Sequence, residues 1–383
     1  MGKKVGLCIC YNVNNFGSAL QCFATVYAVK KLGYDGEIIR YKKNKAFFFK
    51  SLLRIFNPYT LEGKYKRFLS KFNRLIRKDY RIERSKRCSK FEEFRSECFK
   101  PLFSKVCYGY EALCKSSKDY FCVLSGSDQL WLPSGLSTNF YNLKFVNDNV
   151  RRISYASSFG TSSIPWYQIS RTTDYLNRIH CISVRENSGK KIVDDLTGRN
   201  VPVVVDPTLL LSKEEWEEQI PSNNIIGKPY LFAYLLGKNK EHRRLVEYVA
   251  KKLNLQIVSI PHCDHYNVAD VDFGDMHPIS GPKEFVNLVR YADYVCTDSF
   301  HGSIFSVLHK KKFVVFNRYS ENSSVSTNTR IDSLLTNLNL EERRYKVNLL
   351  DELTVPIDYT VVERQIQDMR KTSMDYLRRS LIG

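Results

Sequence analysis

The feature that most constrains the fold of this chain is the regular alternation of short apolar runs with amphipathic segments. The apolar runs have the length and composition of buried strands, and the segments between them have a helical period. Strands that alternate with helices predict parallel sheets with helices on both faces, which is an α/β fold. In the first half, the predicted strands are residues 5–10, 36–41, 120–125, 152–157, 180–185 and 201–205, with a first helix over 18–32.

The same alternation begins again in the second half. The predicted elements there are strands 230–235, 256–260, 294–297 and 313–317, and helices 241–253, 281–291 and 303–309. A chain of 383 residues exceeds the length over which one hydrophobic core usually keeps growing. We therefore expect two Rossmann-like domains, residues 1–211 and 228–361, joined where a charged and then polar segment interrupts the strands. A last helix in 362–383 is expected to pack back on the first domain.

The composition argues against several classes of protein. No run of about 18 apolar residues is present, so no helix is expected to span a membrane, and the first ten residues are typical of a strand rather than of a secretory signal. The 11 cysteines have no CxxC spacing, which favours reduced thiols in a cytoplasmic protein over disulfides or a zinc site. No clustered ligands imply a metal, and no GxGxxG motif follows the first strand, so no cofactor is expected.

The net charge of +19 is concentrated in one segment. Residues 40–90 contain 18 Lys and Arg and three acidic residues, within a basic helical insertion predicted near residues 42–118. Residues 46–56 also mix aromatic and aliphatic side chains with cations, as helices at a membrane surface do. Three interpretations stay open, in decreasing preference: a solvated insertion, a peripheral contact with the anionic inner face of the membrane, and nucleic-acid binding. No recognised nucleic-acid motif accompanies the charge, so nucleic acid is not an expected partner.

Polar loops follow the predicted strands of the first domain. Doubly wound sheets bind ligands at the carboxyl ends of their strands, so these loops are expected to line a ligand site. The candidate binding residues are Asn15, Phe16, Gly17, Ser127, Asp128, Gln129, Ser158 and Arg185. Each loop taken alone is also consistent with a plain turn, and Arg185 with a surface ion pair to Glu186.

A second candidate site lies in the loop before residue 303 in the second domain. An apolar run leads into a polar loop, a glycine and an apolar-periodic segment, which is typical of a strand, a turn and a helix N-terminus. The first amides of a helix lack internal partners and carry the positive end of its dipole, so Ser299, Phe300, His301 and Gly302 are expected to bind an anion. The alternatives are that His301 packs at the start of this helix and that Asp298 caps it.

Six motifs in this order resemble those of the polysaccharide pyruvyl transferases. They are residues 15–21 (NFGSALQ), 125–131 (SGSDQLW), 155–160 (YASSFG), 183–186 (SVRE), 206–210 (DPTLL) and 297–302 (TDSFHG). The resemblance implies a two-domain fold similar to that of the GT-B glycosyltransferases. It also implies transfer of the pyruvyl group of phosphoenolpyruvate to a sugar, usually as a cyclic ketal, with release of phosphate.

The same resemblance implies that Arg185 and His301 bind phosphoenolpyruvate. Relatives often carry Arg-Leu-His where this chain has Ser299-Phe300-His301, so one cation must come from elsewhere in the chain. Arg330 is the candidate for that cation.

The chemistry of this transfer defines the side chains that it needs. A phosphate and a carboxylate must be bound by cations or amides, the methylene carbon must be protonated, and a sugar hydroxyl must be deprotonated. His301 is the candidate acid or phosphate-neutralising cation. Asp128 and Asp298 are candidates for the base or for the group that orients His301.

The expected partners are phosphoenolpyruvate and a sugar acceptor, either free or linked to a lipid. The candidates for binding the acceptor are Asn15, Phe16, Gly17, Ser127, Asp128, Gln129 and Ser158. Two other functions stay open, because a fold does not determine chemistry. One is a GT-B glycosyltransferase with a nucleotide-sugar donor, and the other is a noncatalytic protein that binds an anionic ligand.

Overall fold

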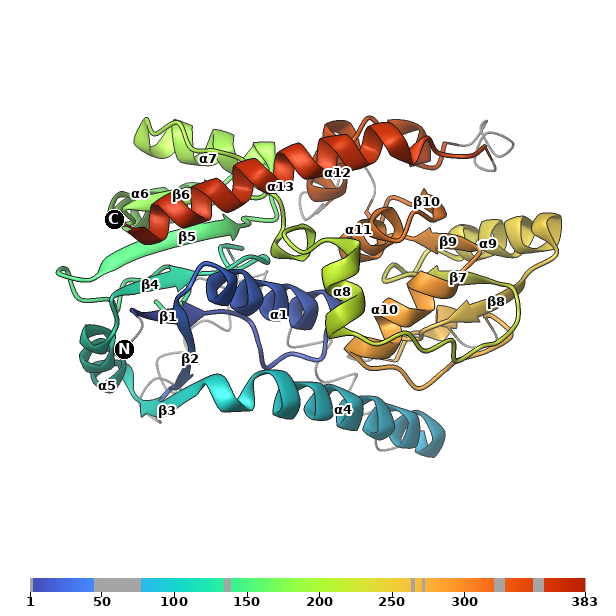
Figure 1. The fold of residues 1–383 in the computed structure, drawn as a ribbon, viewed down its shortest axis with the longest axis horizontal. Helices are drawn as coiled ribbons and strands as arrows, with labels where there is room; N and C mark the ends of the chain where they lie inside the picture. Colours follow the sequence, from blue (N-terminus) through green and yellow to red (C-terminus); the bar gives the residue numbers. More distant parts are fainter. Residues whose placement is uncertain are drawn as a thin grey trace.

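A computed structural model describes residues 3–44, 77–133, 139–262, 266–270, 273–319, 328–346 and 355–382. Its helices and strands form two units, each built on a parallel sheet, which lie side by side along the long axis of the molecule (Figure 1). The predicted α/β class with two parallel, Rossmann-like sheets is confirmed. The aromatic and basic run 46–56 lies outside the described residues.

The N-terminal sheet has six strands in the order β3-β2-β1-β4-β5-β6. All its strand pairs are parallel, and this is the strand order of a Rossmann fold. The strands are β1 (Lys4–Cys8), β2 (Asp35–Lys42), β3 (Phe103–Tyr108), β4 (Cys122–Ser125), β5 (Arg151–Ser157) and β6 (Cys181–Val184). The order reverses between β1 and β4, so the loops after these two strands meet at the edge where such sheets bind ligands.

The helices of this unit connect and cover its strands. They are α1 (Phe16–Lys31), α4 (Lys78–Cys98), α5 (Tyr110–Ser116), α6 (Ile169–Asn177) and α7 (Asn187–Thr197), with short 3-10 turns at Lys100–Leu102, Ser117–Asp119, Trp166–Gln168 and Pro207–Leu209. Helix α1 begins directly after the loop that follows β1, because the Asn15 side chain accepts a hydrogen bond from the Ser18 amide. The start of α1 therefore lies at the ligand-binding edge.

The C-terminal sheet has four parallel strands in the order β10-β9-β7-β8. They are β7 (Tyr230–Tyr234), β8 (Gln256–Ser259), β9 (Tyr294–Thr297) and β10 (Lys312–Val315). The remaining helices are α8 (Lys213–Gln219), α9 (Lys240–Leu253), α10 (Pro282–Tyr291), α11 (Phe300–Leu308), α12 (Thr329–Asn337) and α13 (Tyr359–Ile382), with 3-10 turns at Val268–Asp270 and Glu341–Arg343. No helix in the described part of the chain is long and apolar enough to cross a membrane.

Two long helices connect the units on opposite sides (Figure 1). Helix α13 runs back over the N-terminal unit, where Arg370 Nε donates to the Leu209 carbonyl at 2.7 Å and Ser373 Oγ accepts from the Val205 amide at 3.1 Å. Helix α4 extends the other way, and its buried Arg87 donates to the Pro261 carbonyl at 2.7 Å. Both helices therefore resist relative motion of the two sheets.

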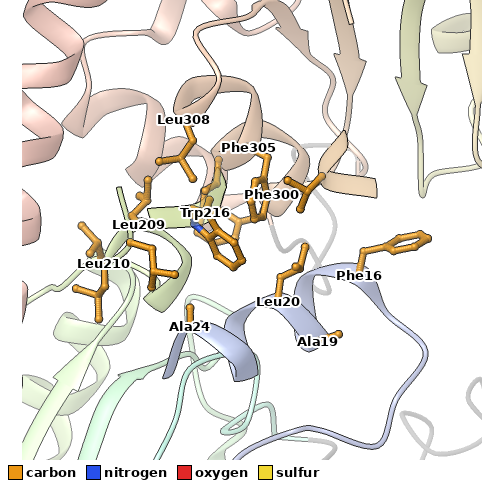
Figure 2. Close-up of a cluster of buried hydrophobic side chains, with 14 of the residues drawn as sticks. Phe16, Ala19, Leu20, Ala24, Leu209, Leu210, Trp216, Phe300, Phe305 and Leu308 are labelled. Atoms are coloured by element: carbon orange, nitrogen blue, oxygen red, sulfur yellow. The ribbon is translucent and has the colours of Figure 1, made fainter. Parts of the chain in front are cut away.

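The apolar core continues from one unit into the other. Figure 2 shows Leu20 of α1 near Trp216 of α8 and near Phe300 and Phe305 of α11, and Phe16 of α1 belongs to the same core. Trp216 is fully buried, and its indole N–H donates to a backbone carbonyl at 2.9 Å. Because α1 and α11 share this core, the starts of the two helices are held at a constant separation.

Several sequence predictions differ from the observed elements. Residues 201–205 form an isolated bridge between Val203 and Val184 rather than a strand, because Pro202 within the run and Pro207 just after it lack the N–H that a ladder needs. The predicted insertion also contains β3, an edge strand whose polar residues obscured its alternation. Helix α11 begins at Phe300, three residues before the predicted start, because Ser299 is its N-cap.

Candidate functional site

A cavity of about 350 Å³ lies between the two units, and we call it the larger cavity. The N-terminal unit contributes the loops after β1 and β4, and the C-terminal unit contributes the start of α11, the segment after β10 and the start of α12. Its lining residues are Cys10, Asn15, Ser18, Asp128, Gln129, Leu130, Leu132, Tyr141, Leu236, Ser299, Phe300, His301, Arg318 and Arg330. The two sets of strand-end loops that were predicted to bind ligands therefore share one cavity.

His301 lies in the first turn of α11 and is 7% exposed. The turn is closed by Ser299, whose hydroxyl accepts from the Gly302 amide at 3.3 Å. On its other side the imidazole packs against the backbone of Gly17 in α1, and a Cβ atom on Gly17 would collide with the ring. The absence of a side chain at Gly17 thus lets the two helix starts approach each other.

Asp206 lies between Arg185 and His301, the two residues that the family resemblance implies bind phosphoenolpyruvate. Its Oδ2 accepts from Arg185 Nη1 at 2.5 Å and from the Ser127 hydroxyl at 2.9 Å, and its Oδ1 lies 3.6 Å from His301 Nε2. Burial alone would raise the pKa of Asp206, but the positive charges of His301 and Arg185 and a hydrogen bond from Thr208 hold that pKa well below its ordinary value. A buried carboxylate therefore joins Arg185 of one unit to His301 of the other.

Asp128 faces the same cavity from the loop after β4. Its φ is +86°, a conformation that side chains other than glycine rarely adopt. Its carboxylate accepts from the Ser18 hydroxyl at 2.5 Å and from the Gln129 amide at 2.8 Å. Burial opposes its ionisation, yet the charges of Arg185 and His301 lower the pKa of Asp128 below its ordinary value, so this carboxylate is ionised near neutral pH.

Two arginines, Arg185 and Arg330, lie against the ring of Phe300, and Arg318 lines the larger cavity together with Arg330. The guanidinium carbons of Arg185 and Arg330 lie 4.6 and 5.6 Å from the centre of the Phe300 ring, and the Arg318 Nη2 donates to the Asp298 carbonyl at 3.1 Å. Arg330 forms no hydrogen bond or ion pair within the described residues. Burial and the charges of Arg185 and Arg318 lower the pKa of Arg330 to about 10. Buried cations with such repulsion favour a bound anion.

The unpartnered donors of the site support this interpretation. Among the described residues, buried nitrogens without an acceptor include Nε and Nη2 of Arg185, Nε of Arg318 and Arg330, and Nε2 of His301. Burying a donor without an acceptor is costly, so a cluster of such donors indicates a place where a ligand supplies oxygen atoms. No group of His, Cys, Asp and Glu side chains in the described part of the chain could hold a metal ion.

Some predicted site residues lie behind the lining of the larger cavity. Phe16 is buried and stacks on Phe285, with 4.9 Å between ring centres. Asp298 accepts from the amides of Leu236 and Gly237, both at 2.6 Å, and thus holds the loop after β7 rather than capping α11. The others are buried or part of the backbone frame: Gly17, Ser127, Ser158, Arg185 and Gly302.

The structure also brings in residues that the sequence analysis did not select. Arg318 comes shortly after β10, so its place after a strand could have indicated a ligand-binding residue. Asp206 follows an apolar run in the same way. No local sequence pattern marked Ser18 and Tyr141 as site residues, because their positions depend on how α1 and the loop after β4 fold back on the sheet.

Solved structures of similar fold share little sequence with this chain. A putative UDP-N-acetylglucosamine 2-epimerase from Listeria monocytogenes is 11% identical, with a TM-score of 0.47, and the match covers 95% of this chain and 94% of that one. A UDP-GlcNAc 2-epimerase from Neisseria meningitidis, bound to UDP-GlcNAc, is 12% identical, with a TM-score of 0.44 and coverage of 96% and 98%. A glycosyltransferase from Streptomyces nogalater is 9% identical, with a TM-score of 0.41 and coverage of 100% and 96%.

A comparison with curated proteins gives no match. The model of the family described as polysaccharide pyruvyl transferase, however, matches residues 15–320. This match includes α1, the loop after β4 and the start of α11, which line the larger cavity, and also the loops after β5 and β6 and Asp206, which lie behind that lining. The chain belongs to the polysaccharide pyruvyl transferase family.

Proposed function

We propose that this transferase moves the pyruvyl group of phosphoenolpyruvate to a sugar of a surface or capsular polysaccharide precursor. The observation that carries the proposal is the cluster of His301, Arg318 and Arg330 beside the ionised Asp128 in one cavity. Phosphoenolpyruvate has two anionic groups and a carbon that must be protonated, and this cluster offers cations, helix amides and an acid.

The donor fits the part of the cavity formed by the C-terminal unit. Arg318 and Arg330 supply guanidinium donors, and the first amides of α11 supply the positive end of a helix dipole. Arg185 contributes its positive charge from behind Phe300, where Asp206 and Ser127 hold its guanidinium. These groups stabilise the phosphate as it leaves.

The acceptor sugar fits the opposite part of the cavity. Asn15, Ser18 and Gln129 present amide and hydroxyl groups there, which suit the hydroxyls of a sugar. Asp128 lies between these residues and His301, and is placed to accept a proton from an attacking hydroxyl. Whether the acceptor is free or lipid-linked does not change this chemistry.

The reaction proceeds by an addition and then a displacement at the same carbon. His301 gives a proton to the methylene carbon, and the oxygen of one sugar hydroxyl bonds to the neighbouring carbon while Asp128 takes its proton. A second hydroxyl then displaces the phosphate and forms the ketal, and its proton leaves with the phosphate. One methyl group, two C–O bonds and one inorganic phosphate result, and no cofactor enters the proposal.

The test is incubation of the full chain with phosphoenolpyruvate and a panel of sugar acceptors, with phosphate release as the readout. We expect release that depends on the acceptor, and a product heavier by one pyruvyl ketal. Release of a nucleoside diphosphate from a sugar nucleotide, without phosphate release from phosphoenolpyruvate, would instead identify a glycosyltransferase. Binding of phosphoenolpyruvate without turnover on any acceptor would favour a noncatalytic role.

A further inference from the structure

A second cavity, of about 240 Å³, lies behind Phe300, and we call it the smaller cavity. Its walls come from the segment 203–206, from Leu334 and Asn337 of α12, and from one face of α13. Phe300 and Arg330 line both cavities, whereas His301 and Asp128 line only the larger one. The smaller cavity is therefore adjacent to the reaction site but does not contain its acid or its base.

The inner end of the smaller cavity is cationic. Arg185 and Arg330 both line it and both lie against the ring of Phe300. Arg185 is 4% exposed, and its Nε and Nη2 have no acceptor, as is also true of Nε of Arg330. Asp206 neutralises one of the two guanidinium groups. Arg330 forms no ion pair with any described residue, and its guanidinium suits a ligand with a single negative charge.

The remaining wall is mostly apolar. Val203, Leu209, Leu334 and Met369 surround the space between the arginines and the opening. Asp368, on an exposed position of α13, also lines the cavity, and its charge disfavours a ligand with two negative groups such as phosphoenolpyruvate. The volume far exceeds the roughly 10 to 15 Å³ that one water needs, so an aliphatic body fits beside a charged head.

Part of this wall lies beyond the family match. The match ends at residue 320, whereas α12 and α13 span Thr329–Asn337 and Tyr359–Ile382. Arg330 and other lining residues on these two helices thus come from a part of the chain that the family model does not describe.

We propose that the smaller cavity is a separate binding site for a small monocarboxylate with an aliphatic body. The carboxylate contacts Arg185 and Arg330, and the aliphatic body contacts the wall formed by Leu334 and Met369. Because Arg330 serves both cavities, the bound carboxylate weakens the hold of Arg330 on the donor, so the two ligands are coupled. Only this coupling rests on the proposed function, since binding to the smaller cavity does not require turnover.

The test uses isobutyrate as the probe and isobutyramide as its uncharged control, measured by titration calorimetry. Thr372→Trp places a large side chain at an exposed lining position of the smaller cavity, and Lys371→Trp adds the same side chain at the neighbouring exposed residue that does not line it. We expect isobutyrate to bind the native chain, Lys371→Trp and His301→Ala, and to lose affinity at least about tenfold in Thr372→Trp. The amide should not bind.

A second measurement uses the KM for phosphoenolpyruvate. Isobutyrate should raise this KM to a plateau of about fivefold, because a coupled site saturates, and Thr372→Trp should abolish the effect. A rise without a plateau would place isobutyrate in the larger cavity and overturn the proposal. Absence of binding to the native chain, or equal binding to Thr372→Trp, would overturn it as well. If isobutyrate binds as expected but phosphate is never released, only the proposed function fails.

Discussion

At the scale of single residues, the site depends on a few buried charges that compensate one another. Asp206 is ionised although it is buried, and Asp128 is ionised although it is half-buried, because the charges of Arg185 and His301 act on both carboxylates. Arg330 has no carboxylate partner among the described residues and stays available for an anion. Changing one member of this group should therefore change both the stability and the chemistry of the protein.

Replacing His301 by Ala should abolish turnover while leaving the protein folded. The imidazole lines the larger cavity from the start of α11, and Ala retains the helix. Phosphate release and the circular dichroism spectrum of the variant test this together. Near-normal phosphate release from a folded His301→Ala protein would rule out the assigned role.

Replacing Arg185 by Lys should raise the KM for phosphoenolpyruvate more than the KM for the acceptor. A point charge would replace the planar guanidinium that now bonds Asp206 and Ser127 and stacks on Phe300. Steady-state kinetics with each substrate varied in turn measures the two effects. Equal changes in both constants would indicate that Arg185 only holds the two units together.

Replacing Asp206 by Asn should change how stability depends on pH. The folded pKa of Asp206 is depressed, so its ion pairs stabilise the native state above the unfolded pKa, and this stabilisation is lost as the pH falls through the folded pKa. The Asp206→Asn substitution would remove that acid-dependent part and, at neutral pH, about 3 to 5 kcal/mol of unfolding free energy. Urea unfolding between pH 2 and pH 7, at about one-unit steps, compares the two proteins. Identical pH slopes would contradict the assigned ion pairs.

At the scale of secondary-structure elements, the site is the meeting point of two helix starts. Helix α1 brings Asn15 and Ser18, and α11 brings Ser299 and His301, and the shared core in Figure 2 holds both helices in place. Their close approach depends on Gly17, since any side chain there would meet the His301 ring.

Gly17→Ala should therefore lower kcat/KM on the order of a hundredfold, because a displacement of about 1 Å at a reacting group can have that effect. Gly189→Ala is the matched control, since Gly189 also lies in a helix and a Cβ atom there would approach its neighbours no closer than 3.3 Å. Activity assays and melting temperatures of both variants separate the two effects. Equal activity of the two variants would show that His301 tolerates a shift.

At the scale of the whole molecule, two parallel sheets enclose the site and two long helices connect them. Helix α4 binds the C-terminal unit through Arg87 and through an ion pair of Lys90 with Glu284 at 3.1 Å. Helix α13 binds the N-terminal unit through Arg370. These contacts hold the two walls of the larger cavity in position relative to each other.

The charge distribution gives a prediction at the same scale. Residues 40–90 carry 18 Lys and Arg against three acidic residues, and aromatic residues gather in 46–56, which lies outside the described part of the chain. We therefore expect the protein to sediment with vesicles that contain anionic lipid. Binding should decrease as salt is raised. Phe47→Ser combined with Phe49→Ser should weaken binding without changing the affinity for phosphoenolpyruvate. Absence of binding at low salt would favour a solvated insertion.

The sequence alone determined the α/β class, the two parallel sheets and the loops that carry the site. These features depend on local patterns, such as apolar runs, helix caps and polar loops after strands. Strand β9 lies at the predicted residues 294–297, for example. The strand within the predicted insertion was harder to predict from the sequence, because polar residues interrupt the alternation of the edge strand β3.

The tertiary structure decided which of these loops act together. Sequence placed Asp128 and Asp298 as equal candidates for the base, but Asp128 lines the cavity, whereas Asp298 binds two backbone amides. Asp206 became central only because residues distant in sequence bring Arg185 and His301 to the same carboxylate. Caps and periodicity act over a few residues and are visible in sequence, whereas burial and the pairing of charges depend on long-range packing, which no short segment contains.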